Sequence, residues 1–337
     1  MEAFTFIDLF AGIGGMRQAA SSNGGVCVFS SEIDRDAASV YEDNFGERPH
    51  GDITLVNEAD VPDHDVLFAG FPCQPFSICG FKRGFEDTRG TLFFHILRIA
   101  REKRPGCLVL ENVKHFANHD GGNTLRVVVA SLEELGYSVA VRVINAVDFG
   151  LPQNRERTII VASLNGVFDF AGMSKSPRKN VSSLLESGVP FEFLDPSDYT
   201  LLPEDVVRHQ AQSGLRFVGY RNRNLRKVGV REGTEHLSRV HKQPNRVYCA
   251  TGTHPTLAAG ESSGRYWILV DGSVRKLTLR ECYRLQGFPD TFLASGSATS
   301  AYRQIGNSVP VPMISEVVRA ARSQGVIGAG IARRLAA

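Results

Sequence analysis

The residues best suited to chemistry in this chain surround Cys73, within the stretch DVLFAGFPCQPFS at 65–77. A short apolar run ends at Gly70, and Pro72 and Pro75 flank the cysteine. The apolar run predicts a buried strand, the glycine allows a turn, and the prolines stiffen the segment that follows. This pattern presents Cys73 at the mouth of a cleft as a nucleophile, because its thiolate is the attacking species.

Two further sets of polar residues follow apolar runs. Glu111 opens the tripeptide ENV at the end of a predicted buried strand, where a carboxyl group can have a raised pKa and act as an acid. In QNRER, at 153–157, an extended backbone places Gln153, Arg155 and Arg157 on one face. Two arginines directed at a cleft could hold a carboxylate or a phosphate, and the alternative is a surface ladder of ion pairs.

Alternating apolar runs and helical patterns indicate how these residues are positioned. Strands are expected at 4–10, 26–31, 51–54, 65–70, 107–113, 137–146 and 157–163, and helices at 16–23, 34–45, 92–103 and 122–135. This α/β alternation predicts a parallel, doubly wound sheet with ligands at the carboxyl ends of its strands.

The first strand leads into a glycine turn, AGIGG at 11–15, which lets a ligand approach the backbone. The turn is not GxGxxG, because counting from Gly12 the final glycine position holds Arg17. Glu32 could bind a ribose hydroxyl pair and Asp52 an adenine amino group. Residues 1–70 hold 13 Asp and Glu against 3 Lys and Arg, which suits a positively charged cofactor and favours S-adenosylmethionine over a dinucleotide.

The composition of the 337 residues is that of a globular enzyme, with 42% hydrophobic and 22% charged residues. The sequence shows no membrane span or signal peptide, and the six cysteines form no CxxC pair, so neither a disulfide framework nor a metal site is expected. A reducing cytoplasm fits this cysteine usage. Residues 208–246 hold 10 Lys and Arg against 2 Asp and Glu, a density that suggests contacts with nucleic-acid phosphates.

The composition changes after about residue 170, which predicts a second, smaller domain. Strand-like segments occur at 215–220, 225–230, 245–250 and 265–270, separated by Gly, Asn and Pro. They indicate a β-rich, loop-heavy domain with little core. An amphipathic helix is expected within 275–289, and another at 314–324.

Seven motifs together resemble those of the DNA cytosine-5 methyltransferases, most closely the small bacterial enzymes of restriction–modification systems. They are FIDLFAGIGG (6–15), GDI (51–53), GFPCQPFS (70–77), ENV (111–113), QNRER (153–157), RKLTLRECYRLQGFP (275–289) and GNSVP (306–310). The resemblance runs from residue 4 to about 318 and is weakest between 186 and 274. It implies a Rossmann-like S-adenosylmethionine-dependent methyltransferase sheet with a β-rich target-recognition domain.

The resemblance also implies a domain division. The catalytic domain spans 1–185 and is completed by 300–325. The recognition domain spans 186–299, braced by 275–289, and a tail follows at 326–337.

The implied reaction is methyl transfer to C5 of a flipped-out cytosine in a specific duplex sequence. Cys73 adds to C6, which makes C5 nucleophilic. By analogy Glu111 bonds N3 and the exocyclic amine, and Arg155 lies at the base and the nucleophile, with Arg157 in a structural role. The loop at 78–91 closes over the substrate.

The family match implies the remaining contacts. For S-adenosylmethionine, which leaves as S-adenosylhomocysteine, they come from Phe10, Ala11, Gly12, Ile13, Gly14, Gly15, Glu32, Ile33, Asp52, Ile53, Pro72, Leu92, Asn307, Ser308 and Val309. For DNA it places Thr256 and Leu257 against the target phosphate region. The segment after the nucleophile adds Gln74, Ser77, Cys79 and Arg89, and the basic composition of 221–246 indicates Arg221, Arg223 and Lys242.

Double-stranded DNA is thus the expected partner of a monomeric, cytoplasmic, nucleoid-associated bacterial enzyme, with a restriction endonuclease acting independently. Two alternatives share part of the pattern. A tRNA cytosine-5 methyltransferase would share the catalytic lobe, and the basic middle segment favours DNA. A nucleotide-dependent oxidoreductase explains the alternating fold and Glu32, but leaves GFPCQPFS and ENV without a role.

Overall fold

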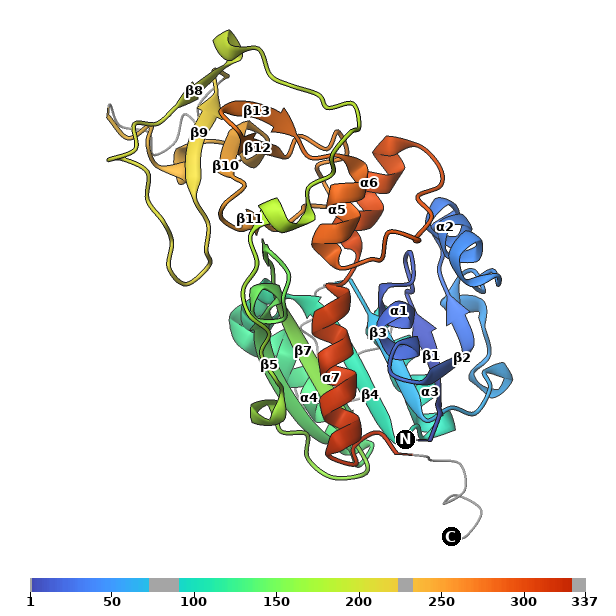
Figure 1. Ribbon diagram of the computed structural model, residues 1–337. Coiled ribbons are helices and arrows are strands. Elements are labelled where there is room, and N and C mark those ends of the chain that lie inside the picture. The colour runs from blue at the N-terminus through green and yellow to red at the C-terminus, as the bar shows by residue number, and fades with distance from the viewer. Residues whose placement is uncertain (1, 73–90, 224–232, 329–337) are drawn as a thin grey trace. The chain divides into compact units, whose positions relative to one another are not determined.

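The computed structural model describes residues 2–72, 91–223 and 233–328 (Figure 1). Contacts divide these residues into two compact units. Unit 1 contains the described residues of 1–145, 156–175 and 311–337, and unit 2 those of 146–155 and 176–310. The functional division expected near 185 and 300 remains a prediction, and the limits of the two units differ from it.

Unit 1 is an α/β unit. Its strands are β1 (Phe4–Leu9), β2 (Gly25–Ser31), β3 (Val66–Gly70), β4 (Cys107–Val113), β5 (Ser138–Asn145) and β7 (Glu156–Ser163). Its α-helices are α1 (Gly15–Ser21), α2 (Arg35–Phe45), α3 (Leu92–Lys103), α4 (Asn123–Glu134) and α7 (Val311–Ser323). The strands form one six-stranded sheet in the order β2-β1-β3-β4-β7-β5.

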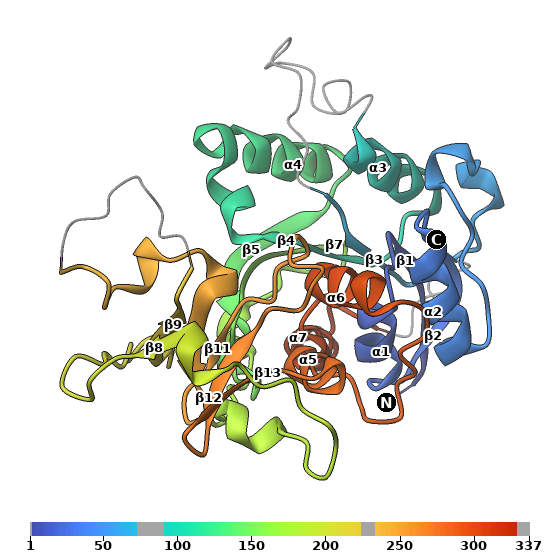
Figure 2. The same cartoon turned by 90° about the horizontal axis from the view of Figure 1, so that it is seen from above.

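Helices cover both faces of this sheet. Figure 2 shows α3 and α4 on one face and α1, α2 and α7 on the other. Alternate residues of β1, such as Ile7 and Leu9, join the buried apolar cluster beneath α3 and α4. The α/β expectation is therefore confirmed, and the helix expected from residue 314 begins at Val311 and packs beside α1.

Two local expectations about this sheet are wrong. The sheet is mixed, because β7 runs antiparallel to both of its neighbours, β4 and β5. Residues 51–54 form no strand: Asp52 accepts a hydrogen bond from the Thr54 amide, 2.9 Å away, and so caps the 3₁₀ helix Ile53–Leu55. A short polar side chain that bonds the next backbone amides favours a helical turn over an extended ladder.

Unit 2 is rich in short strands. They are β6 (Gln153–Asn154), β8 (Tyr199–Leu201), β9 (Phe217–Arg221), β10 (Arg246–Cys249), β11 (His254–Pro255), β12 (Trp267–Val270) and β13 (Ser273–Lys276). Five of them form a sheet in the order β13-β12-β10-β9-β8, while β6 pairs with β11. Helices α5 (Leu279–Gln286) and α6 (Ala298–Asn307) complete it.

Three of the strand expectations in unit 2 are confirmed with shifted bounds, as β9, β10 and β12. The strand expected at 225–230 lies outside the described residues. The sequence analysis did not predict helix α6. Its first turn is capped by the hydroxyl of Ser297, which accepts a hydrogen bond from the amide of Ser300 at 3.1 Å. Among the described residues no helix is long and apolar enough to cross a membrane.

Candidate active site and cofactor turn

Glu111 lies near the carboxyl end of β4, directly opposite Gly70 of the neighbouring parallel strand β3. Glu111 as a whole residue is 8% exposed to solvent. A Cβ atom at Gly70 would lie 3.6 Å from Oε2 of Glu111, so the glycine keeps bulk away from this carboxylate. The two strands thus place a carboxylate near their carboxyl ends, where the chain leaves β3 and continues to Pro72 and Cys73 in the sequence.

The other carboxylate oxygen of Glu111 is held by Arg157. Nε of Arg157 lies 2.8 Å from Oε1 of Glu111, and both side chains are about 10% exposed. Arg157 reaches it from β7, where it stands opposite Val113 in the antiparallel pair. Burial lowers the pKa of Arg157 and the charge of Glu111 opposes that shift. A buried cation beside a buried anion fixes both in position.

Asn112 holds the chain segment that leads to the predicted nucleophile. Its side-chain amide donates to the carbonyl of Phe71 at 2.8 Å, and its own Oδ1 accepts from the amide of Val113. Sequence reasoning assigned Asn112 no role, although a polar residue inside a buried strand end is a signal for one. Cys73 itself lies outside the described residues, as do Gln74, Ser77, Cys79 and Arg89.

Arg155 belongs to unit 2 and is 1% exposed. Its Nη1 donates to the carbonyl of Leu257 at 3.0 Å, and Nη2 donates to the carbonyls of Gly306 and Ser308 at 2.8 and 2.6 Å. Gln153 acts similarly, since it donates to the Leu285 carbonyl at 2.8 Å. Among the described residues the guanidinium of Arg155 therefore binds main-chain carbonyls of its own unit.

The described contacts of the two arginines differ, and their expected roles, Arg155 at the base and Arg157 in a structural role, remain predictions. Arg157, expected to be structural, is the one paired with Glu111. Arg155, expected at the base, is engaged by three carbonyl oxygens of unit 2. β6 ends at Asn154 and β7 begins at Glu156, so Arg155 lies between the two strands in unit 2, whereas Arg157 lies in β7 of unit 1.

The glycine turn after β1 is built around left-handed backbone positions. Phe10, Gly12 and Gly14 have φ angles of 57°, 55° and 85°. A Cβ at Gly14 would lie 2.2 Å from the ring of Phe45, so only glycine fits there. At Gly12 no atom of the described residues, its two chain neighbours aside, lies within 4 Å of the corresponding position. The turn is thus tightly packed at one glycine and open at the other.

Glu32, at the end of β2, holds this turn. Its Oε2 accepts from the amide of Gly12 at 2.7 Å, and its Oε1 accepts from the amide of Asp34 at 2.8 Å. Burial raises the pKa of Glu32, and these amide hydrogen bonds oppose the rise. The adjacent Ile33 is 70% exposed, which leaves an apolar side chain uncovered next to the carboxylate.

Asp52 stands at a second loop of unit 1, and the hydrogen bond from the Thr54 amide is the main cause that lowers its pKa. Arg98 of α3 fastens this loop, donating to the Ile53 carbonyl at 2.7 Å and to Glu58 at 2.6 Å. Ile53 is buried at 3% exposure. The other expected cofactor residues of unit 1, Phe10, Ala11, Ile13, Gly15, Pro72 and Leu92, are described, and their cofactor contacts stay predictions.

Asp8 in β1 is a buried acid that sequence reasoning did not single out. It is 0% exposed, and neither carboxylate oxygen accepts a hydrogen bond from the described residues. Burial raises its pKa to about 8, the charge of Arg17 opposes the rise, and the charge of Glu32 adds to it. Its position inside FIDLFAGIGG, between apolar neighbours, was the available signal.

The residues expected at DNA are distributed within unit 2. Thr256 donates to the Asn154 carbonyl at 2.8 Å, and Leu257 is 1% exposed. The guanidinium of Arg221 lies over the ring of Trp267, 5.0 Å from its centroid, so this arginine packs on the sheet. Arg223 and Lys242 instead line a polar cavity.

The three residues after Gly306 also lie in unit 2. Asn307 is exposed, and the hydroxyl of Ser308 is buried without a hydrogen-bond partner among the described residues. Val309 is buried. Their expected contacts with the cofactor remain predictions. Elsewhere in the described part of the chain, no group of three or more His, Cys, Asp or Glu could hold a metal ion.

Comparison with known proteins shows which class this fold and site define. The sequence profile of the family described as "C-5 cytosine-specific DNA methylase" matches residues 4–323. The chain belongs to this family and is a DNA cytosine-5 methyltransferase.

Two curated relatives cover almost the whole chain. The Type II methyltransferase M.HhaI of Haemophilus parahaemolyticus is 44% identical over 94% of this chain and 94% of its own length. The Type II methyltransferase M.NgoBI of Neisseria gonorrhoeae is 42% identical over 91% of this chain and 90% of its own. The Dnmt2 methyltransferase of S. pombe shares the fold, with a TM-score of 0.66 and 20% identity over 96% of this chain and 99% of that one. These matches do not favour the dehydrogenase or the RNA alternative.

Replacing Asp8 by asparagine should stabilise the protein most at high pH. The pKa of Asp8 rises from 3.8 to about 8 on folding, so the folded state retains a proton that the unfolded chain releases, and stability falls as pH rises through that window. Asparagine cannot ionise. Asp8→Asn should therefore gain free energy of unfolding relative to the parent. We expect this gain to be larger at pH 8.5 than at pH 5 by roughly 2–4 kcal/mol.

Urea titration at the two pH values measures this difference. Asp43→Asn, at an exposed position of α2, is the matched control and should show the same small effect at both. An equal gain for Asp8→Asn at pH 5 and pH 8.5 would contradict a buried acid that titrates near 8.

Replacing Arg155 by lysine should destabilise unit 2. One ammonium group cannot reproduce a planar fork that reaches the carbonyls of Leu257, Gly306 and Ser308. We expect a loss of about 3 kcal/mol, measured by chemical denaturation. Arg216→Lys is the control, because its partner Glu204 is a surface carboxylate, and it should change stability by less than about 0.5 kcal/mol. Equal effects of the two changes would show that the carbonyl contacts contribute little.

Proposed function

We propose that this protein methylates C5 of cytosine within a specific duplex DNA sequence, using S-adenosylmethionine, as the modification enzyme of a restriction–modification system. The observation that carries the proposal is the buried Glu111–Arg157 pair near the carboxyl end of β4. Glu111 stands opposite Gly70 of β3, and Gly70 precedes Cys73 by only three residues in the sequence. Bisulfite sequencing of duplex DNA incubated with protein and cofactor tests it.

The chemistry needs a nucleophile and a polarised base. In the proposed reaction the thiolate of Cys73 forms a bond to C6 of cytosine, and the electron pair of the C5–C6 double bond becomes available at C5. Glu111 hydrogen-bonds N3 and the exocyclic amine, which draws electrons from the ring. Arg157 holds Glu111 in place and directs positive charge to the site. C5 would then form a bond to the methyl group that S-adenosylmethionine supplies, with S-adenosylhomocysteine as the leaving group. Loss of the C5 proton restores the C5–C6 double bond, breaks the bond from Cys73 to C6 and releases the thiolate.

The glycine turn of unit 1 fits a nucleoside cofactor with a positively charged amino-acid portion. Support comes from the open space at Gly12, the exposed Ile33, and the carboxylates of Glu32 and Asp52. We infer that Glu32 binds the ribose hydroxyls and that Asp52 binds the adenine amine. When bound, S-adenosylmethionine supplies the electrophilic methyl group and leaves as S-adenosylhomocysteine.

A duplex substrate places further demands on the chain. A base stacked inside DNA is out of reach, so we propose that the target cytosine is flipped out of the duplex; the loop expected at 78–91 lies outside the described residues up to residue 90. The relatives named Type II methyltransferases support a modification role. We infer that the enzyme acts as a monomer on bacterial DNA in the cytoplasm, at the nucleoid, and that a cognate restriction endonuclease acts independently of it.

Duplex DNA carrying 5-fluorocytosine at the target should trap the enzyme covalently. Fluorine at C5 cannot leave as a proton, so the bond from Cys73 to C6 persists. Cys73→Ser should form no adduct that survives denaturing electrophoresis. Cys79→Ser, which alters a neighbouring thiol, is the matched control and should still be trapped. An adduct with Cys73→Ser would remove Cys73 from the proposed role.

Weakening the Glu111–Arg157 pair should slow turnover more than it weakens DNA binding. We expect Glu111→Gln to lower kcat by roughly 10²–10⁴-fold, with duplex affinity changed by less than about 3-fold. Arg157→Lys keeps the charge but loses the Nε–H donor, and should lower kcat by about 10–100-fold.

The control for both changes is Lys114→Met, which removes a neighbouring surface ion pair with Glu156. It should leave kcat within about 2-fold. Single-turnover rates and filter binding separate the two readouts. A loss confined to DNA affinity for Glu111→Gln and Arg157→Lys would contradict the assigned roles.

A further inference from the structure

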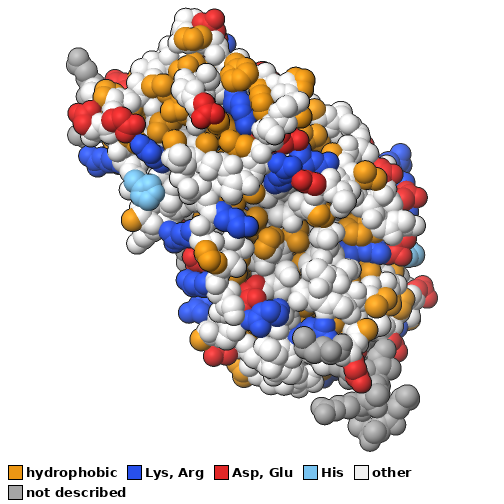
Figure 3. Space-filling model, in the orientation of Figure 1, with side chains coloured by type: hydrophobic (Ala, Val, Ile, Leu, Met, Phe, Trp, Pro, Cys, Tyr) orange, Lys and Arg blue, Asp and Glu red, His pale blue; other side chains and the backbone are white. Residues whose placement is uncertain are grey.

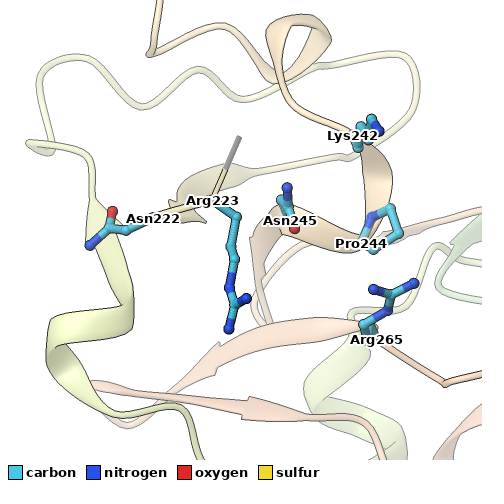
Figure 4. A pocket seen from close by; sticks show the side chains of 6 residues that line it. All are labelled: Asn222, Arg223, Lys242, Pro244, Asn245 and Arg265. Atoms are coloured by element: carbon cyan, nitrogen blue, oxygen red, sulfur yellow. The ribbon is translucent and has the colours of Figure 1, made fainter. Parts of the chain in front are cut away.

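Unit 2 contains a polar cavity of about 630 Å³ that the reaction chemistry does not use. It is lined by Asn222, Arg223, Lys242, Pro244, Asn245 and Arg265 (Figure 4). The lining residues supply positive charge and amide groups, and no acidic residue is among them. The surface around it carries both signs, since the face of unit 2 seen in Figure 3 shows Asp and Glu beside Lys and Arg. The cavity is therefore a local concentration of positive charge.

Arg265 is held in a fixed orientation by Glu261. Its Nε and Nη2 each lie 3.0 Å from a carboxylate oxygen of Glu261, which is 6% exposed, whereas the arginine side chain is 47% exposed. The hydrogen bonds that Arg265 donates to Glu261 raise the pKa of Arg265. One edge of the guanidinium is thus bound to a buried anion while the rest faces outward.

The loop that carries this pair is itself braced. The amide of Glu261 donates to the Ala258 carbonyl at 3.0 Å, and the hydroxyl of Tyr266 donates to the same carbonyl at 3.0 Å. Gly264 adopts φ 61°, and a Cβ there would lie 2.1 Å from the Tyr302 ring. These contacts fix the backbone that leads into Arg265, which helps to orient its side chain.

The remaining donors of Arg265 match one kind of acceptor. A guanidinium has five N–H groups, and two of them bind Glu261. The outward Nη1/Nη2 edge keeps two parallel donors, the geometry that pairs with O6 and N7 of guanine in the major groove. Asn245 lies across the cavity, and no hydrogen bond to its side-chain amide occurs among the described residues. Its amide can both donate to and accept from a base edge.

Two of the neighbouring residues are used for support instead. The Asn222 side chain accepts from Thr200 at 2.7 Å and donates to the Ser197 carbonyl at 2.9 Å, and it points away from the other labelled side chains in Figure 4. Arg221 lies over Trp267, whose indole N–H donates to the Pro244 carbonyl at 3.0 Å. The side-chain amide of Asn222 is thus engaged by neighbouring residues, and Arg221 and Trp267 are not among the described residues that line the cavity.

Arg223 and Lys242 are exposed, and neither forms an ion pair with a described residue. Burial lowers the pKa of the nearby Arg221, the charges of Arg223 and Arg265 lower it further, and the charges of Asp198 and Glu192 oppose the shift. Flexible cations without a fixed partner suit phosphate oxygens, which position a duplex without specifying its sequence.

We propose that the Glu261-held Arg265, with Asn245 across the cavity from it, reads a guanine in the recognition sequence, and that Arg223 and Lys242 contact the phosphates around it. This proposal rests on the proposed function, since it assigns the base-reading surface of a sequence-specific DNA methyltransferase. Glu261 is a positioning residue that acts through Arg265. Arg221, expected from the sequence to bind DNA, packs over Trp267, and its contact with DNA remains a prediction.

Selection from randomised duplexes tests the proposal with the full chain. Bound duplexes are sequenced to define the recognition sequence, and the same pools are then incubated with S-adenosylmethionine and read by bisulfite sequencing. For Arg265→Lys we expect the preference for guanine at one position to fall on the order of 10–100-fold, with the other positions unchanged. Glu261→Gln should relax the same position by a smaller factor. A stability scan of each variant confirms that it folds.

The phosphate contacts have a different signature. Arg223→Ala and Lys242→Ala should weaken binding to all sequences alike, and each should reduce the slope of log affinity against log salt by about 1. Arg216→Ala, a charge-matched change outside the cavity lining, should alter neither the preference nor the slope. A salt slope unchanged by Arg223→Ala and Lys242→Ala would overturn their assignment.

The base-reading assignment and the proposed function fail in different ways. An unchanged guanine preference in both Arg265→Lys and Glu261→Gln would overturn the assignment of Arg265, as would a wild-type protein that selects no sequence. A wild-type protein that selects a sequence but leaves its cytosines unmethylated would overturn the proposed function, while the guanine preference of the variants still decides the role of Arg265.

Discussion

The candidate active site depends on the buried pair between Glu111 and Arg157. Either charge alone would cost several kcal/mol to bury, so the two stay inside the protein only because Nε and Oε1 lie 2.8 Å apart. The pairing requires an antiparallel β7, because in that register Arg157 stands opposite Val113 and its side chain lies diagonal to Glu111 on the same face. The reversal of one strand in an otherwise parallel sheet is therefore what completes the site.

The chain leaves and re-enters the sheet around the same segment. Gln153 and Arg155 bind carbonyl groups of unit 2, whereas Arg157, two residues later, is part of unit 1. Main-chain carbonyls buried at loop and helix ends need donors, and a planar guanidinium supplies several in fixed directions. One short polar motif thus serves two structural tasks and supplies one candidate catalytic contact.

Elsewhere, polar side chains fix the positions of neighbouring groups. Glu32 holds the amide of Gly12, Asn112 holds the carbonyl of Phe71, and Glu261 holds the guanidinium of Arg265. In each case a hydrogen bond joins the supporting side chain to its neighbour. Asp8 is the exception, because it is fully buried and no described residue donates a hydrogen bond to it. Its cost is reduced by a raised pKa rather than by a partner.

The sequence by itself determined the class of protein, the α/β lobe and the residues around which the site is built. Apolar periodicity is a local property, so most strands and helices could be predicted from it, and motif order identified the family. Only the tertiary structure decided the direction of β7, the 3₁₀ turn at Asp52, and the different partners of Arg155 and Arg157. These features depend on which buried donors and acceptors meet across segments distant in the chain, and alternation along one segment contains no record of that.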